Sequence, residues 1–185
     1  MTVIDSPISD YPGARPILAA VSLDTQGQHC LRHACRQATL SGAVVVALHV
    51  VHETGRNAGF YRQHDTGQLL RPIDEVARGL LADVTAEVLG GEPGCGEQQP
   101  QLLVVDGVPE RRIPEVAERI GAGLIIVGGQ RLRGLDRLFG RNVARQVLLK
   151  ARCPVMVVDS DGNSVDPQDL LAGYHGGYRG VLQTR

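Results

Sequence analysis

Arginine is concentrated in one short segment of the chain, directly after an apolar run that ends at Gly128 and Gly129. This segment and the helix expected after it carry Arg131, Arg133, Arg137, Arg141 and Arg145. Each guanidinium brings a fixed positive charge and a fork of N–H donors that matches phosphate, and a helix start also favours an anion. The pattern predicts an anion site. The alternative is a solvated basic surface, partly neutralised by Asp136.

Two histidines have a spacing that suits a metal. His29 and His33 lie four residues apart on an expected helix, so they fall on one face of it. The sequence offers no third ligand nearby. We therefore expect no metal site and interpret both histidines as exposed structural residues.

The four cysteines are Cys30, Cys35, Cys95 and Cys153, and they include no C-x-x-C pair. Cys30 and Cys35 are five residues apart on an expected helix and so point in different directions. We expect neither a metal site nor a disulfide framework, and we interpret Cys153 as a small hydrophobe. This cysteine usage fits a reducing cytoplasm. No Ser-His-Asp order, carboxylate pair or Walker loop predicts a catalytic residue.

The length and charge of the chain limit the classes of partner. At 185 residues the chain suits one domain with its own core. Its 19 lysines and arginines against 20 aspartates and glutamates give a net charge of -1, which predicts no binding to nucleic acid or to an anionic membrane. The first residues lack the pattern of a leader, and no apolar run reaches the roughly 18 residues of a membrane span. We expect a soluble, cytoplasmic protein.

Five apolar runs alternate with four amphipathic segments between Arg15 and Asp159. The runs predict buried strands, and the segments, in which apolar residues recur every three or four positions, predict helices. The expected strands are Ile17–Val21, Ala43–Val51, Leu102–Val105, Leu124–Val127 and Pro154–Val158; the expected helices are residues 26–40, residues 72–89, a segment from about Pro109 to Gly121, and residues 142–151. Asp24 or Thr25 can cap the first helix. This order predicts an α/β fold with an open, five-stranded, parallel, doubly wound sheet and helices on both faces.

Three segments lie outside this pattern. Residues 1–14 predict a flexible arm before a domain at residues 15–159. The polar segment from His52 to Arg71 is either a functional flap or a disordered insert. Residues 160–185 predict a partly disordered tail with one short helical turn at Asp166-Pro167, outside the core and dispensable for folding. The tail's candidates for binding a protein client are Leu170, Leu171, Tyr174 and Tyr178.

Three stretches of the chain resemble the universal stress protein family, a branch of the adenine nucleotide α hydrolase-like fold. They are Ile17–Ala34, Val105–Gly129 and Val143–Val158, and the end of the second expected strand, Leu48-His49-Val50, also matches. The resemblance covers about Arg15–Asp159. It implies a five-stranded parallel sheet and a homodimer paired through the last strand, Pro154–Val158. In one branch of the family it also implies ATP or AMP bound over the carboxyl ends of the strands.

The nucleotide-binding branch has a loop of the form G-x-x-G, nine residues, then G-[ST]. Its glycines let backbone N–H groups approach phosphates. Two alignments of this chain remain open for the first two glycine positions: Gly128 with Arg131, or Gly129 with Leu132. In both alignments Arg141 and Asn142 take the last two positions.

The resemblance places the rest of the nucleotide site at the ends of the first two strands. The family's aspartate falls on Ser22, with Asp24 two residues later. The adenine position falls on Val50, beside His49, whose alternative interpretation is a core histidine with one hydrogen bond. The residues implied to contact a nucleotide are Ala20, Ser22, Asp24, Val50, Gly128, Gly129, Arg131, Leu132, Arg141, Asn142 and Val143.

These substitutions in the loop set the expected function. Since at least two glycines of the loop are replaced, we expect ATP to bind weakly or not at all, with a salt-sensitive preference for phosphate or AMP. Our interpretation is a non-enzymatic, cytosolic stress-response module that binds partners and, weakly, a phosphate-containing ligand. The alternative is an ATP- or AMP-binding member of the family that acts as a nucleotide sensor or a slow nucleotide hydrolase.

Overall fold

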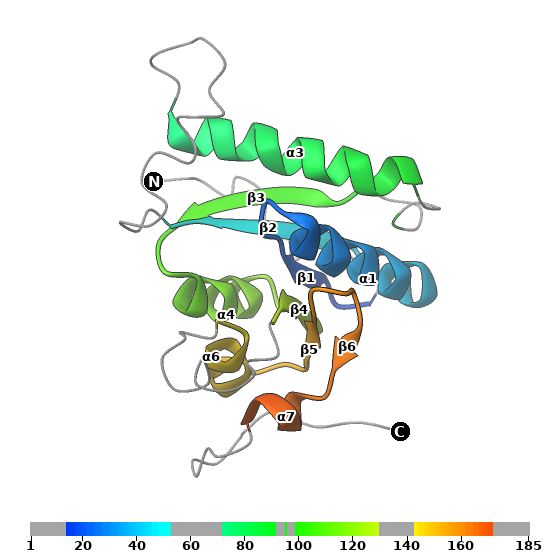
Figure 1. The fold of residues 1–185 in the computed structure, drawn as a ribbon, viewed down its shortest axis with the longest axis vertical. Helices are drawn as coiled ribbons and strands as arrows, with labels where there is room; N and C mark the ends of the chain where they lie inside the picture. The colour runs from blue at the N-terminus through cyan, green and yellow to red at the C-terminus, as the bar shows by residue number, and fades with distance from the viewer. Residues whose placement is uncertain (1–13, 53–71, 92–94, 96–98, 130–142, 172–185) are drawn as a thin grey trace.

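The computed structural model describes residues 14–52, 72–91, 95, 99–129 and 143–171. The elements are β1 (Ile17–Ala20), α1 (Thr25–Ser41), β2 (Val45–Val51), α3 (Ile73–Gly91), β3 (Gln101–Asp106), α4 (Pro109–Arg119), β4 (Leu124–Gly128), α6 (Val143–Lys150), β5 (Val155–Val158), β6 (Ser164–Val165) and α7 (Pro167–Leu171). Strands and helices alternate as far as β5 (Figure 1). The predicted alternation is confirmed. Residues 1–13 of the expected flexible arm and residues 53–71 of the polar segment fall outside the described residues, so both interpretations remain predictions.

The sheet has the strand order β3-β2-β1-β4-β5-β6. Strands β1 to β5 are parallel, and in this register Ala20 at the end of β1 lies opposite Leu48 of β2 and Val127 of β4. The predicted parallel sheet is confirmed, although a sixth strand is added to it. The chain leaves β1 toward β2 on one side and returns to β4 on the other, which is where open α/β sheets bind ligands at the carboxyl ends of their strands.

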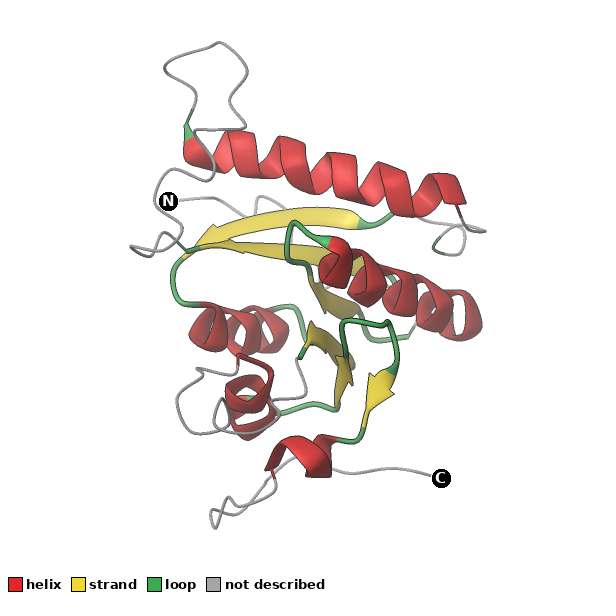
Figure 2. Cartoon of the chain, in the orientation of Figure 1, coloured by secondary structure: helices red, strands yellow, loops and turns green. Residues whose placement is uncertain are grey.

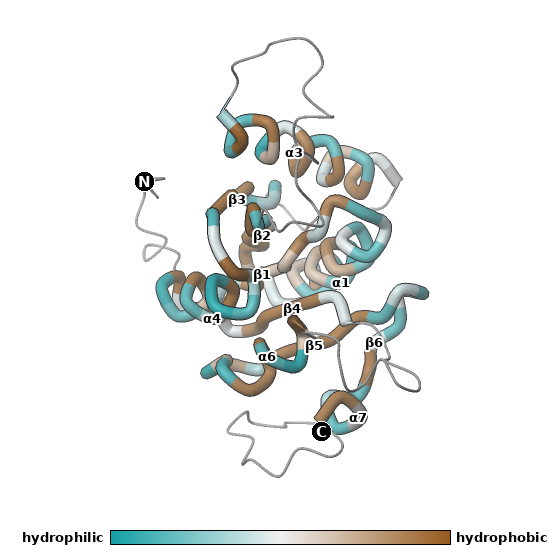
Figure 3. Tube along the Cα trace, turned by 60° about the vertical axis from the view of Figure 1, so that its left-hand side comes forward, coloured by the Kyte–Doolittle hydropathy of each residue, from teal (hydrophilic) through white to brown (hydrophobic). Residues whose placement is uncertain are grey.

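Both faces of the sheet are covered by helices, as Figure 2 shows. Ile125 and Ile126 are consecutive residues of β4 and both are fully buried, the first in the core that includes α4 and α6, the second in the core that includes α1 and α3. Burial of such a side chain contributes about 1.5–3 kcal/mol, so a central strand is held from both sides. The strands are accordingly the most hydrophobic part of the chain in Figure 3. None of the described helices is long and apolar enough to cross a membrane.

The chain after β5 differs from the expectation of a tail outside the core. β6 pairs antiparallel with β5, with Val165 opposite Val157 and Ser164 opposite Val158. The side chain of Val165 is 2% exposed and belongs to the α4/α6 core. The expected helical turn after Asp166 is confirmed as α7. Two strand residues are too few to show the alternation that identifies a strand in a sequence, so β6 could not be predicted.

This pairing also corrects the premise of the expected homodimer. Pro154–Val158 is not a free edge, because β6 covers its carboxyl half. Self-association through this strand stays a prediction, and so does a client contact of the tail. Of the residues named for that contact, Leu170 and Leu171 are half-buried in α7, whereas Tyr174 and Tyr178 lie outside the described residues.

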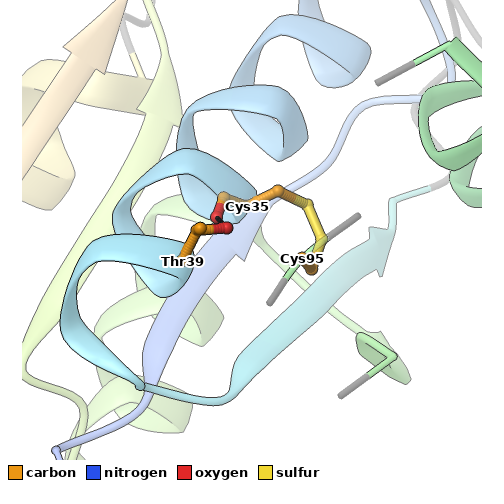
Figure 4. The surroundings of a disulfide bond; sticks show 3 residues. All are labelled: Cys35, Thr39 and Cys95. Carbon is orange, nitrogen blue, oxygen red and sulfur yellow. Dashed lines mark hydrogen bonds between the residues drawn. A yellow bond between two sulfur atoms is a disulfide. The ribbon is translucent and has the colours of Figure 1, made fainter. Parts of the chain in front are cut away.

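The expectation that the chain has no disulfide is wrong. Cys35 of α1 is bonded to Cys95, which lies between α3 and β3 (Figure 4). Both residues are buried in the α1/α3 core. The two cysteines are separated by 60 residues, and only the packing of α3 beside α1 brings them together. The other two described cysteines, Cys30 and Cys153, are free thiols.

Candidate functional site

A cavity of about 250 Å³ opens at the carboxyl end of the parallel strands, at the point where the order of the sheet reverses. It is lined by the ends of β1, β2 and β4 and by the first residues of α1, α4 and α6. The lining residues are Ala20, Val21, Ser22, Gln26, Leu48, His49, Val50, Pro109, Ile113, Val127, Gly128 and Val143. Because every one of these helices starts at this edge, the positive ends of three helix dipoles lie close to the cavity.

The structure brings part of the expected nucleotide site together. Ala20, Ser22, Val50, Gly128 and Val143 all line the cavity. Their contact with a nucleotide remains a prediction. They come from four separate regions of the chain, so only the parallel sheet can place them around one space.

Two other expected residues do not line the cavity. The carboxylate of Asp24 caps α1, where it accepts a 3.0 Å hydrogen bond from the backbone N–H of Gly27. Gly129 is buried; a Cβ atom there would lie 2.5 Å from a methyl group of Val157 and 3.0 Å from Cβ of Ala144. This glycine is therefore required for packing between β5 and α6, and its backbone N–H donates to Val158.

The remaining expected residues, Arg131, Leu132, Arg141 and Asn142, lie outside the described residues. The predicted anion site cannot be built from Arg133 or Arg137 for the same reason. Of the five arginines in that prediction, only Arg145 is described, half-buried in α6. The anion site and its choice of glycine alignment therefore stay predictions.

The hydroxyl proton of Ser22 is used within the β1–α1 turn, although the residue lines the cavity. Its Oγ donates a 2.6 Å hydrogen bond to Oδ1 of Asp24, the same atom that caps α1. The turn from β1 into α1 is tight, because a Cβ atom at Gly27 would lie 1.8 Å from the carbonyl oxygen of Ser22. This short turn places Ser22 at the cavity and next to Asp24, the residue that caps α1.

Gln26 is a cavity residue that the sequence did not indicate. Its amide Nε2 donates a 3.4 Å hydrogen bond to the carbonyl oxygen of Val158. Its side chain also lies against Gly128, where a Cβ atom would be 2.8 Å from Cδ of the glutamine. The helical period of α1 predicted which of its residues face the sheet, but not that the side chain of Gln26 in the first turn would point toward the cavity. The one signal in the sequence was its place in the first turn of the helix that follows the first strand.

His49 is both a core residue and part of the cavity wall. Its side chain is 7% exposed, and Nδ1 donates a 2.8 Å hydrogen bond to the carbonyl oxygen of Val21. Burial lowers the pKa of His49, and the bond to Val21 offsets this only in part. The imidazole is therefore uncharged near neutral pH. Its interpretation as a core histidine is confirmed, and the neighbouring Val50 lines the same cavity.

The described lining of the cavity is electrically neutral. Its polar side chains are one hydroxyl, one amide and one uncharged imidazole, from Ser22, Gln26 and His49, around an apolar wall. Such a wall suits a planar, apolar ring with a few hydrogen-bonding atoms better than a bare anion. Within the described parts of the chain, no group of three His, Cys, Asp or Glu side chains could hold a metal ion.

Comparison with known proteins agrees with this architecture. The model of the Universal stress protein family matches residues 13–159. Universal stress protein A homolog 1 of Coxiella burnetii is 29% identical over 143 residues, which cover 77% of this chain and 94% of that protein.

Two solved structures from Archaeoglobus fulgidus share the fold. One, of a universal stress protein, has a TM-score of 0.54 and 28% identity, and the match covers 78% of this chain and 93% of that one. The second, of the universal stress protein in complex with dAMP, has a TM-score of 0.52 and 27% identity, and the match covers 78% and 97% of the two chains. The family match extends over every described strand from β1 to β5 and the helices between them. The chain belongs to the universal stress protein family.

Proposed function

We propose that this chain is a cytoplasmic stress-response module that binds a nucleoside monophosphate weakly in the cavity and acts through partner binding rather than catalysis. The observation that carries the proposal is the neutral, mostly apolar cavity at the reversal point of the sheet, lined by Ser22, Gln26, His49 and Val50. A related protein, 27% identical, binds dAMP. A nucleobase offers the planar ring that this wall suits.

The size and charge of the cavity support weak binding. At about 250 Å³ it is smaller than the roughly 300–1,000 Å³ of pockets that enclose drug-sized ligands, so phosphate groups must lie beyond its rim. The described lining contains no charged side chain that could attract those phosphate groups. The arginines that follow Gly129 in the sequence can attract them, but ordering each long side chain costs about 0.5–1.5 kcal/mol.

The hydrogen bonds of the site support a role without catalysis. In a catalytic triad the carboxylate accepts from the histidine, and the histidine accepts from the serine. In this cavity Ser22 donates to Asp24 instead, and Nδ1 of His49 donates to a backbone carbonyl. Neither bond activates the serine hydroxyl as a nucleophile.

The second candidate function is a nucleotide sensor or slow nucleotide hydrolase that binds ATP. The dAMP complex of the related protein is consistent with this function too, because dAMP and ATP share the adenine base. The two functions differ in affinity and in dependence on salt. A glycine-lined phosphate loop binds ATP through backbone N–H groups, whereas arginine side chains exposed to solvent are screened by salt.

Titration calorimetry with adenosine, AMP, ATP and inorganic phosphate at low and high salt separates these functions. We expect AMP to bind with a Kd of about 0.1–1 mM, ATP to bind no more tightly, and added salt to weaken both. Phenylalanine in place of Val50 should fill the cavity and abolish binding. Phenylalanine in place of Val51 is the matched control, since this half-buried neighbour packs on the opposite face of the sheet.

Each outcome decides between the functions. ATP binding near 1 µM that resists salt would favour the sensor over our proposal. Equal binding by both phenylalanine variants would place the ligand outside the cavity. If none of the four compounds bound, the ligand would be removed from the proposal and the partner-binding role would stand alone.

A further inference from the structure

Residues 159–171, which we call the C-terminal strap, run along the β5 side of the sheet. The strap consists of the turn after β5, strand β6 and helix α7, which lie at the lower right of the sheet in Figure 1. β6 forms two pairs with β5, at Val157 and Val158. The strap therefore occupies the position of the next strand in the sheet.

The turn at the start of the strap is held by several hydrogen bonds. The side chain of Asp159 accepts from the backbone N–H groups of Asp161, at 3.0 Å, and Asn163, at 2.8 Å. Gly162 adopts a φ of 81°, which favours glycine, and its carbonyl oxygen accepts a 2.8 Å hydrogen bond from Nε2 of His33 in α1. The turn is thus attached to a helix on the opposite side of β5 from α6.

The far end of the strap is attached to the other face of the sheet. Val165 is buried in the α4/α6 core, and α7 packs against α6 and β5. Leu170 of α7 is half-buried, and its Cδ1 lies 3.8 Å from the position of a Cβ atom at Gly129. The strap is therefore fixed at both ends to elements that precede it in the chain.

The strand beneath the strap would otherwise recruit another strand. β5 has the sequence Val-Met-Val-Val, and an apolar edge with unpaired backbone groups is a template for pairing with another chain. Native proteins cover such edges. A second copy of this chain carries the same strand, and two identical strands can pair antiparallel about a two-fold axis.

We propose that the C-terminal strap closes the β5 edge against a second copy of this chain, so that self-association through β5 requires release of the strap. Within the described residues β6 pairs with only two of the four residues of β5, and Val155 and Met156 have no partner in β6. A second β5 strand could pair along the full length, but only after displacing β6. The strap and the second copy therefore compete for one edge.

Sedimentation velocity of the full chain tests this competition. Val165→Asp places a carboxylate in the core and should release β6, so we expect the average sedimentation coefficient to rise with concentration more steeply than for the wild type. Ser164→Asp is the matched control, since it adds the same charge one residue earlier, at an exposed position. This control should sediment like the wild type.

Two milder variants guard against a failure of Val165→Asp to fold. His33→Ala removes the hydrogen bond to Gly162, and Gly162→Ala brings a Cβ atom within 2.8 Å of the His29 ring. Hydrogen exchange of a peptide that covers the strap reports its release in each folded variant. Faster exchange together with increased self-association would support the proposal. Faster exchange with unchanged sedimentation, or a wild-type dimer that dissociates when the strap is released, would overturn it.

Discussion

Oδ1 of Asp24 accepts two hydrogen bonds at once, from Oγ of Ser22 at 2.6 Å and from the backbone N–H of Gly27 at 3.0 Å. This oxygen thus holds both the cap of α1 and the serine at the cavity. We expect Asp24→Ala to lower the free energy of unfolding by about 1 kcal/mol, the usual effect of losing such a cap. Asp24→Asn keeps an acceptor oxygen and should retain most of that stability. Urea denaturation measures both, and equal stability of the alanine variant and the wild type would refute the cap.

Alanine in place of either of two glycines within helices should have opposite effects on stability. Gly27→Ala would place a Cβ atom 1.8 Å from the backbone carbonyl of Ser22, so the β1–α1 turn must open. Gly79 lies in α3 with nothing within 4 Å of its virtual Cβ atom. We expect Gly79→Ala to stabilise the protein by about 0.5–1 kcal/mol and Gly27→Ala to destabilise it by more than that. Thermal denaturation of the two variants tests the pair, and a neutral Gly27→Ala would show that the turn tolerates a side chain.

The parallel sheet was predictable because its signal is repeated along the chain. β4 is an apolar run buried on both faces, and the segments between the strands have a clear helical period.

α4 was predicted in spite of Pro114 inside it. Proline leaves the carbonyl of the residue four positions earlier without its helical donor, and here Nζ of Lys150 donates to that oxygen, on Glu110, at 3.3 Å. No local pattern could have identified a lysine 40 residues away as that donor.

The candidate site was predictable only where a resemblance supplied the position. Ser22 and Val50 were expected from the family pattern and do line the cavity. Asp24 was expected there too, but local hydrogen bonding turns it to the helix cap. Gln26 was missed because its role depends on the path of the β1–α1 turn, and Val165 was missed because its strand has only two residues. Long-range contacts of single residues leave no periodicity in the sequence.

The bond between Cys35 and Cys95 predicts a stability that depends on reductant. It closes a loop with a sequence separation of 60, and a cross-link of this kind contributes about 2–4 kcal/mol. We expect Cys95→Ser to lower the free energy of unfolding by that amount without reductant and to have little effect in dithiothreitol. Cys153→Ser is the control, since this thiol is free.

Burial raises the pKa of Cys30 to about 12, so that residue should resist alkylation while the protein is folded.

The disulfide prediction has two opposite outcomes in a denaturant titration. If reductant shifts the unfolding midpoint of the wild type toward that of Cys95→Ser, the bond exists in solution and stabilises the fold. If the wild type and the variant have the same midpoint with and without reductant, the two residues are thiols in the folded protein.

The buried imidazole of His49 predicts how stability changes with pH. Burial lowers its pKa from the ordinary value of 6.5, so below that pH the unfolded chain takes up a proton that the folded chain resists. The unfolded state then binds more protons, and stability falls as the pH decreases from 6.5 until it passes the folded pKa. His49→Asn keeps a donor for the carbonyl of Val21 but cannot titrate, so its stability should fall less over this range. The other five histidines are common to both proteins and cancel in the difference. Chemical denaturation at several values between about pH 8 and pH 5 measures it, and parallel curves for the two proteins would show that His49 does not resist protonation in the folded state.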